Sequence, residues 1–209
     1  MSASAGRFVV LEGIDGSGTT TQSARLAVSL RASGIEVVST REPSDGPIGQ
    51  VLRRALTRQL PGMSDRTLAL LFAADRLDHL ATVVEPALTE GKVVVSDRYV
   101  LSSLAYQGMR LPLRWVETLN AAARRPDLTL FLEVDPGTAA RRRQGRGGTE
   151  ELFDADEVQR AVARAYTRVA RKHARTQRVV RVDGGGSPEE IAGEILSKVQ
   201  ALLSRPRRK

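Results

Sequence analysis

Short apolar segments alternate with amphipathic segments along the chain, which predicts an α/β fold: a doubly wound parallel sheet of five strands between two layers of helices. The apolar segments are continuous and partly β-branched, as is typical of strands buried on both faces of a parallel sheet. A glycine-rich loop directly follows the first of them. The expected strands are residues 8–11, 35–39, 93–95, 128–132 and 179–182.

Helical patterns fill the intervals between these strands. Gly34 and Gly91 stand where two of the helices should end, and Ser187 with Pro188 provides a cap and a first-turn proline. Pro86 lacks an N–H donor, so it should bend or interrupt the long third helix. The expected helices are residues 20–32, 48–57, 64–90, 113–124, 154–175 and 188–203.

The length of 209 residues fits one domain with one core. Within it, residues 139–153 combine an arginine cluster with a glycine-rich stretch and are expected to form a mobile lid, and residues 205–209 form a basic tail. The absence of cysteine excludes a disulfide framework, a thiolate zinc site and a cysteine nucleophile.

The net charge of +8 raises the question of a nucleic-acid partner. The basic residues are interleaved with acidic ones along most of the chain, and no aromatic residue lies within the arginine run 141–146. A base-stacking platform is therefore not expected. No signal core and no stretch of about 20 apolar residues is present. We expect a cytoplasmic protein with neither a membrane nor a nucleic acid as its partner.

The glycine-rich loop has the strand-loop-helix setting of a P-loop, whose backbone N–H groups surround phosphate oxygens at a helix N-terminus. It departs from the usual pattern because Thr19 replaces the lysine that neutralises β- and γ-phosphate charge. The Thr20 hydroxyl stands at the position of the magnesium ligand. Residues expected at the ATP phosphates are Gly13, Ile14, Asp15, Gly16, Ser17, Gly18, Thr19, Thr20 and Thr21.

Phe72 and Arg76 are four residues apart and would share one face of the third helix. An aromatic ring at that place can stack on a base, while a guanidinium can donate to a carbonyl at the edge of the base. Thymine presents an acceptor at O4 where cytosine presents an amino donor, so an arginine there would favour thymine. Taken alone, the pair is better explained by a core phenylalanine and a solvated arginine.

Four blocks together resemble the thymidylate kinase family along nearly the whole chain. They are the P-loop, residues 40–43 (Thr-Arg-Glu-Pro), residues 70–76 (Leu-Leu-Phe-Ala-Ala-Asp-Arg) and residues 97–108, which begin Asp-Arg-Tyr. Their order and spacing are similar to those of the family. The resemblance implies a P-loop nucleoside monophosphate kinase that uses ATP and Mg²⁺ to phosphorylate dTMP to dTDP, and it implies a homodimer.

The resemblance also implies roles for individual residues. Arg98 would bridge the donor and acceptor phosphates, Asp15 would bind the 3′-hydroxyl, and Tyr106 would pack against C2′ of the sugar. Thr20 would bind Mg²⁺, and Asp97 would orient Arg98 or reach the ion through water. The residues implied at dTMP are Asp15, Arg41, Pro43, Phe72, Arg76, Arg98, Ser103, Tyr106 and Gln107.

The arginine run resembles the lid of a bacterial subtype that carries a small residue, here Gly16, after the P-loop aspartate. A lid arginine that closes over the γ-phosphate could supply the charge that Thr19 lacks. The sequence does not distinguish among the four catalytic candidates in this run, which are Arg141, Arg142, Arg143 and Arg146.

Three other functions remain open at this point. The chain could be a kinase for another deoxynucleotide or for a deoxynucleoside. The replacement of lysine by Thr19 leaves a catalytically impaired nucleotide-binding protein of the same fold as a second alternative. A basic protein that binds nucleic acid is the third, and it would show steeply salt-dependent binding.

Overall fold

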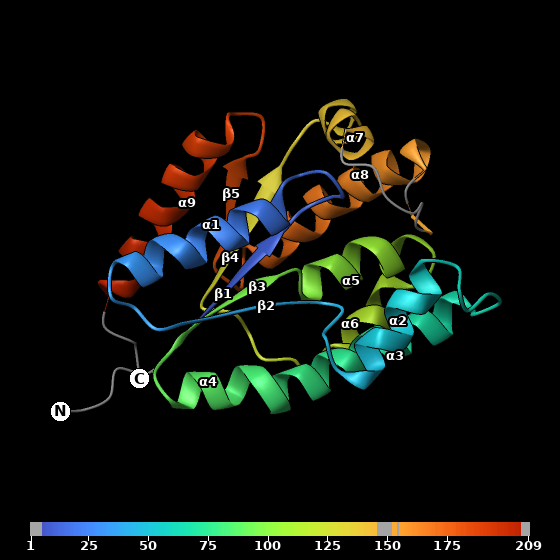
Figure 1. Cartoon of the computed structure of the whole chain (residues 1–209). Coiled ribbons are helices and arrows are strands. Elements are labelled where there is room, and N and C mark those ends of the chain that lie inside the picture. The colour runs from blue at the N-terminus through green and yellow to red at the C-terminus, as the bar shows by residue number, and fades with distance from the viewer. Residues whose placement is uncertain (1–5, 146–151, 154, 206–209) are drawn as a thin grey trace.

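A computed structural model, which describes residues 6–145, 152–153 and 155–205, contains a five-stranded sheet in the order β2-β3-β1-β4-β5 (Figure 1). All four neighbouring pairs are parallel, which confirms the predicted sheet. The strands are β1 (Arg7–Glu12), β2 (Val37–Arg41), β3 (Val93–Asp97), β4 (Leu128–Glu133) and β5 (Val179–Asp183).

The sheet is buried most deeply at its centre. Every residue of β3 is buried, and β1 is buried from Phe8 to its last residue, because both strands have neighbours on each side and helices on each face. The outer strands β2 and β5 are only partly buried. Strand β2 starts at Val37, two residues later than the apolar pattern predicts, and ends in the polar segment Ser39 to Arg41.

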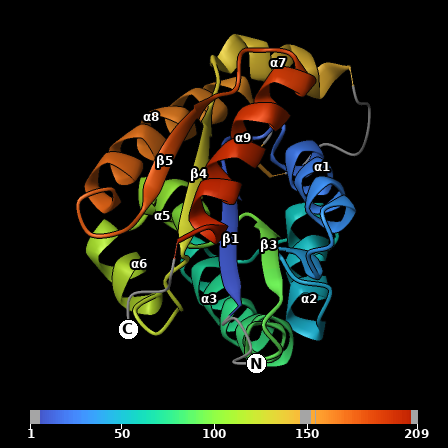
Figure 2. The same ribbon diagram turned by 90° about the vertical axis from the view of Figure 1, so that its left-hand side faces the viewer.

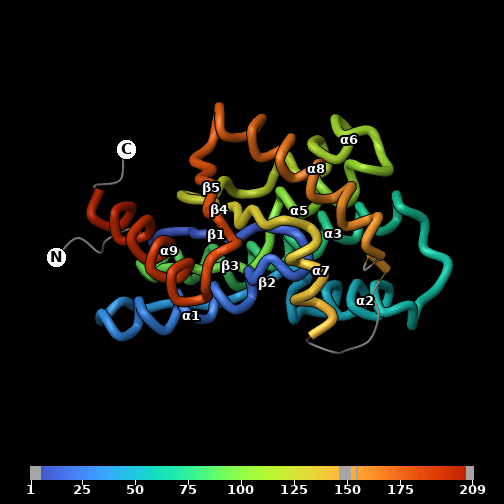
Figure 3. Tube along the Cα trace, turned by 90° about the horizontal axis from the view of Figure 1, so that it is seen from above, coloured from blue at the N-terminus to red at the C-terminus, as the bar shows by residue number. Residues whose placement is uncertain are grey.

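Helices cover both faces of the sheet, as the seen-from-above view in Figure 3 makes clear. Helices α1 (Thr19–Ala32) and α9 (Pro188–Leu203) pack together on one face, where their leucine, isoleucine and valine side chains meet those of the strands. Helices α5 (Val100–Tyr106) and α8 (Asp156–His173) pack against each other on the opposite face.

The remaining helices surround these layers (Figure 2). They are α2 (Pro47–Leu56), α3 (Asp65–His79), the π-turn η1 (Leu80–Val84), α4 (Glu85–Thr89), the 3₁₀ turn η2 (Gln107–Met109), α6 (Leu113–Leu119) and α7 (Pro136–Gln144).

Three further helical segments differ from the sequence prediction. The predicted helix 64–90 widens into η1 just before Pro86, which suits a residue that cannot donate to the preceding turn. The predicted helix 113–124 ends at Leu119. Helix α5 was not predicted, because five of its seven residues are buried and it shows no polar face.

The first half of the predicted lid is a regular helix, α7, which begins at Pro136 after the capping residue Asp135. Residues 146–151 of the lid, residue 154 of the predicted helix 154–175 and residues 206–209 of the predicted basic tail lie outside the described residues. Among the helices that the structure describes, none combines the length and hydropathy needed to cross a membrane.

Candidate active site

A cavity of about 830 Å³ opens at the carboxyl ends of β1, β2 and β3. Open α/β sheets bind their ligands at this edge. The cavity lies between the P-loop, the loop after β2 and helices α3, α5 and α7. It brings together fourteen predicted site residues: Asp15, Gly16, Gly18, Thr19, Thr20, Arg41, Pro43, Phe72, Arg76, Arg98, Ser103, Tyr106, Gln107 and Arg143.

The P-loop turns sharply at two glycines, Gly16 and Gly18, which have φ angles of 88° and 96°. Glycine adopts this left-handed conformation without the steric cost that a side chain adds. At Gly16 a Cβ atom would lie 2.3 Å from the Ala139 carbonyl oxygen, whereas one at Gly18 would meet nothing within 4 Å. Gly16 is therefore a point of close contact between α7 and the P-loop.

Thr19 begins α1 and lines the cavity, although its side chain is nearly buried. The next residue, Thr20, donates its hydroxyl proton to Asp97 Oδ2 at 2.5 Å. The other oxygen of Asp97, Oδ1, is buried and has no hydrogen-bond partner in the described chain. An unpartnered carboxylate oxygen beside a threonine hydroxyl is a donor set suited to a hard cation such as Mg²⁺.

Arg98 stands at the end of β3 with a φ of 71°, an unusual value for a residue with a side chain. Its backbone N–H donates to the Leu11 carbonyl at 2.8 Å, and Ser96 Oγ donates to the Arg98 carbonyl at 2.8 Å. Its guanidinium donates from Nη1 to the Gly13 carbonyl at 3.0 Å. The strained backbone thus turns the guanidinium toward the P-loop.

Asp15 connects the P-loop to the rest of the site. Its Oδ1 accepts from Arg98 Nη2 at 2.5 Å, and its Oδ2 accepts from the Tyr106 hydroxyl at 2.7 Å and from Gln159 Nε2 at 2.6 Å. The guanidinium of Arg98 also lies over the Tyr106 ring, 5.6 Å from its centre. Burial, together with the nearby Asp15 carboxylate, raises the pKa of Tyr106, so its hydroxyl stays a donor at neutral pH.

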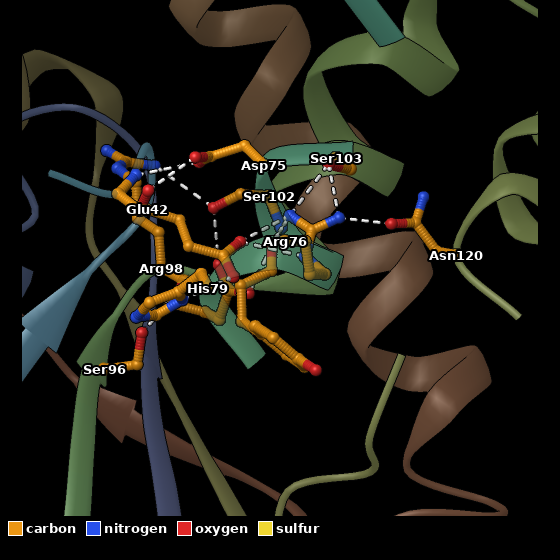
Figure 4. Close-up of polar contacts among 12 residues, drawn as sticks. Glu42, Asp75, Arg76, His79, Ser96, Arg98, Ser102, Ser103 and Asn120 are labelled. Atoms are coloured by element: carbon orange, nitrogen blue, oxygen red, sulfur yellow. Dashed lines mark hydrogen bonds and ion pairs between the residues drawn. The ribbon is translucent and has the colours of Figure 1, made fainter. Parts of the chain in front are cut away.

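Arg76 lies on α3 with 1 % of its surface exposed, and buried acceptors surround its guanidinium (Figure 4). It forms an ion pair with Glu42 at 2.7 Å, and it donates to Asn120 Oδ1 and to the Tyr99 carbonyl. Nη1 and Nη2 also donate to Ser103 Oγ, at 3.2 Å and 3.1 Å. The Ser103 oxygen thus accepts twice, and its hydroxyl proton remains to be donated elsewhere.

The lid arginines have different surroundings. Arg143 lines the cavity, donates from Nη1 to the Asp15 carbonyl at 2.9 Å and pairs with Asp156 at 2.6 Å. Arg142 donates to the Gly184 carbonyl at 2.9 Å, and Arg141 bonds to Thr138 Oγ1 at 2.8 Å on the exposed surface. Of the three that the structure describes, Arg143 alone lines the cavity, and Arg146 lies outside the described residues.

Several other predicted residues are near the site but do not line the cavity. Ile14 is part of the core, Thr21 faces solvent, and Ser17 Oγ is buried without a partner in the described chain. A backbone contribution of these residues to phosphate binding needs no cavity-lining side chain. The predicted residues outside the lining are Gly13, Ile14, Ser17, Thr21, Asp97, Arg141 and Arg142.

The sequence prediction missed the second layer of the site. Glu12, fully buried at the end of β1, accepts from the Ser102 hydroxyl at 2.6 Å and from the Tyr166 hydroxyl at 3.0 Å. Burial raises the pKa of Glu12. A carboxylate that ends an apolar strand was a visible signal for this residue. Tyr166 and Gln159 lie on α8, where their positions follow an ordinary helical pattern and carry no such signal.

Comparison with known proteins identifies the family. A family model described as thymidylate kinase matches residues 11–195. The thymidylate kinase of Ruegeria pomeroyi is 41% identical over 209 residues, which cover 97% of this chain and 98% of that protein. The probable thymidylate kinase of Pyrococcus horikoshii is 41% identical over 203 residues (95% and 98%), and the thymidylate kinase of Synechococcus sp. is 42% identical over 202 residues (94% and 96%). The chain belongs to the thymidylate kinase family.

Proposed function

We propose that the protein is a dTMP kinase that transfers the γ-phosphoryl group of ATP to dTMP and releases dTDP and ADP. Family membership supports this function over nearly the full length of the chain. The observation that carries it is the position of Arg98, whose guanidinium bonds to the P-loop at Gly13 and Asp15 and stacks on Tyr106 of the acceptor side. A positively charged guanidinium between the donor and acceptor phosphate sites can stabilise the charge that develops during phosphoryl transfer.

The donor site is the P-loop and the start of α1. Backbone N–H groups at a helix N-terminus attract phosphate through their partial positive charges. We assign the phosphates of ATP to residues 13–21 on that basis. The positive φ of Gly16 and Gly18 supports this assignment, since it allows consecutive N–H groups to turn toward one point.

Thr20 and Asp97 would hold Mg²⁺ at the donor phosphates, with Asp97 bonding directly or through water. The buried and unpartnered Asp97 Oδ1 fits this role. A bound Mg²⁺ neutralises phosphate charge and fixes the phosphate orientation.

The acceptor site lies between Phe72, Ser103, Tyr106 and Gln107, all of which line the cavity. Arg76 directs the Ser103 hydroxyl, whose free proton can be donated to O4 of thymine. Gln107 has a buried Oε1 without a partner in the described chain, and that oxygen can accept from N3–H of the base. Cytosine would present a donor to Ser103 and an acceptor to Gln107, so the site favours thymine.

Tyr106, Asp15, Arg41 and Pro43 complete the acceptor side. The Tyr106 ring would pack against C2′ and exclude a ribose hydroxyl there. Asp15 would share its carboxylate with the 3′-hydroxyl, and Arg41, which pairs with Asp45 at 2.9 Å at the cavity rim, would approach the phosphate.

The transfer itself requires no general base, because the attacking phosphate oxygen of dTMP is already anionic. That oxygen forms a bond to the γ-phosphorus, and the bond from this phosphorus to the β,γ-bridging oxygen breaks, leaving its electron pair on ADP. The protein contributes alignment of the two phosphates and neutralisation of their charge by Arg98 and a lid arginine. We assign the lid role to Arg143 because it lines the same cavity as Thr19 and bonds to the P-loop at the Asp15 carbonyl.

We also propose that the protein is a homodimer. Leu70 and Leu77 on α3 are 51% and 43% exposed, and they are two of the three large exposed apolar side chains in the described chain. Ala74 and Ala81 are exposed between and beyond them, so one face of α3 and η1 is apolar over three turns. A second copy of this face is the partner that would cover it.

The function is tested by measuring ADP release with ATP and Mg²⁺ and with dTMP, dUMP, dCMP or thymidine as the acceptor. We expect the highest kcat/KM with dTMP and very slow turnover of dCMP. Faster turnover of dCMP or of thymidine would assign the protein to another deoxynucleotide or deoxynucleoside. Nucleotide binding without transfer to any acceptor would support the catalytically impaired alternative that Thr19 raises.

A further inference from the structure

Gln159, a residue with no assigned role, forms two hydrogen bonds with the P-loop. It lies near the start of α8 and is 1% exposed. Its Oε1 accepts from the Asp15 backbone N–H at 3.2 Å, and its Nε2 donates to the Asp15 carboxylate at 2.6 Å. One side-chain amide therefore fixes both the backbone and the side chain of a P-loop residue.

The second N–H of the same amide donates to the Phe153 carbonyl at 2.9 Å. Phe153 belongs to the carboxyl end of the predicted lid 139–153, and its ring lies against Tyr106 with 5.3 Å between ring centres. An amide has two N–H donors and one carbonyl acceptor, and Gln159 uses all of them in these contacts. The residue thus joins the P-loop, the end of the lid segment and the acceptor side.

These hydrogen bonds to Asp15 matter because Asp15 also binds Arg98 and Tyr106 of the proposed site. Its carboxylate accepts from Arg98 at 2.5 Å and from Tyr106 at 2.7 Å. We propose that Gln159 is a positioning residue: it holds the Asp15 carboxylate at the place where Arg98 and Tyr106 meet it, and it links that place to the lid segment through Phe153. The inference rests on the proposed kinase function for its effect on turnover.

The chemistry requires an amide at this position. A glutamate has the same length and can accept from the Asp15 N–H, but it would place a second carboxylate against Asp15. A leucine keeps much of the volume but leaves the Asp15 N–H and the Phe153 carbonyl without this partner. Gln159→Glu and Gln159→Leu therefore disrupt the hydrogen bonds to Asp15 and Phe153 in two different ways.

Gln22 provides a matched control. It is 3% exposed, lies on α1 and donates from its side-chain amide to the Pro188 carbonyl at 3.0 Å. Gln22→Leu removes a buried glutamine amide of the same kind without touching Asp15. Stability of each variant is compared by thermal unfolding, and activity is expressed per folded molecule.

We expect both Gln159 variants to lower kcat on the order of a hundredfold, the effect of misplacing a catalytic group by about 1 Å, while ADP affinity changes little. In an Asp15→Asn background, Gln159→Leu should lower kcat much less, because the group through which it acts is already altered. Equal loss of kcat in Gln22→Leu, or full additivity with Asp15→Asn, would overturn the proposal.

Hydrogen exchange gives a test that does not depend on activity. Gln159→Leu should speed deuterium uptake in peptides that contain the Asp15 amide, and Gln22→Leu should not. If the natural protein fails to phosphorylate dTMP but this difference appears, the proposed function fails and the positioning role stands. Unchanged uptake around Asp15 would overturn the positioning role even in an active kinase.

Discussion

Thr19 and Arg143 decide, at the scale of single residues, how this site compensates for a missing lysine. Arg143 has five N–H donors, of which one bonds to the Asp15 carbonyl and one to Asp156. The remaining donors can meet phosphate oxygens in the two-point geometry that a guanidinium offers. Asp156 is half exposed, so it can release the guanidinium at modest cost.

Removing Arg143 should therefore lower kcat, and a lysine in the P-loop should restore part of the lost activity. We expect Arg143→Ala to lower kcat on the order of a hundredfold, as removal of a group that stabilises transition-state charge does. Thr19→Lys in the Arg143→Ala background should recover much of the activity. Steady-state kinetics of the single and double variants with dTMP measures both effects.

Two further variants make this result specific. Arg141→Ala should cost much less, because Arg141 bonds to Thr138 outside the cavity. Arg164→Ala controls for the loss of an exposed arginine on α8. A larger loss in Arg141→Ala than in Arg143→Ala would show that the lid role belongs to Arg141 and would contradict the assignment.

Glu12 gives the site a predictable pH dependence of stability. Burial raises the pKa of this carboxyl above its ordinary value of 4.5. A raised folded-state pKa means that Glu12 stabilises the fold fully below 4.5 and that this contribution is lost as the pH rises through the raised value. The stability advantage of the natural protein over Glu12→Gln should therefore shrink from about pH 4 toward pH 8 in denaturant unfolding.

Glu190 supplies a control of opposite sign. The Ser187 backbone N–H lowers the pKa of Glu190 at the start of α9, so its contribution to stability is present above 4.5 and is lost as the pH falls through the lowered value. Glu190→Gln should lose less stability in acid than at neutral pH. If the stability advantage of the natural protein over Glu12→Gln instead grew with pH, as expected for Glu190, burial could not be raising the pKa of Glu12.

At the scale of elements, the contact between α7 and the P-loop positions the lid arginines. Gly16→Ala would drive a methyl group into the Ala139 carbonyl, whereas Gly18→Ala has the same strained φ but open space around it. We expect Gly16→Ala to lower kcat more than Gly18→Ala and to speed hydrogen exchange along α7. Equal effects in the two variants would mean that backbone strain alone matters and that the contact does not.

Most of the elements could be predicted from the sequence because each buried strand is a short apolar run, partly β-branched, and the intervals between the strands carry helical patterns. Helix α5 could not, since nearly all of its side chains are buried and a one-sided pattern is absent. The wider turn η1 needed a choice of hydrogen-bond register that Pro86 indicates but does not specify.

Some residues of the site could also be predicted from the sequence, and others could not. P-loop and cavity residues such as Arg98 and Tyr106 stand in recognisable motifs, and the structure brings them together in one cavity. Glu42 and Asn120, which surround Arg76, come from the β2–α2 loop and the end of α6. Their contact with Arg76 depends on how elements far apart in the sequence pack, and no local sequence pattern predicts it.

At the scale of the whole molecule, the exposed apolar face of α3 and η1 predicts self-association. Leu77→Glu would place a charge in the centre of the proposed interface and should convert the dimer to a monomer in sedimentation experiments. Val28→Glu is the control, because Val28 is 64% exposed on α1 and lies outside that face. A natural protein that sediments as a monomer, or a Leu77→Glu variant that stays dimeric, would contradict the proposed interface.

We expect this P-loop to support phosphoryl transfer to dTMP without its lysine. The most direct test is a coupled ADP-release assay on the natural sequence with ATP and Mg²⁺, with and without dTMP. We predict ADP release that depends on dTMP and yields dTDP in equal amount. ADP release that is absent, or that proceeds equally well without dTMP, would contradict the claim.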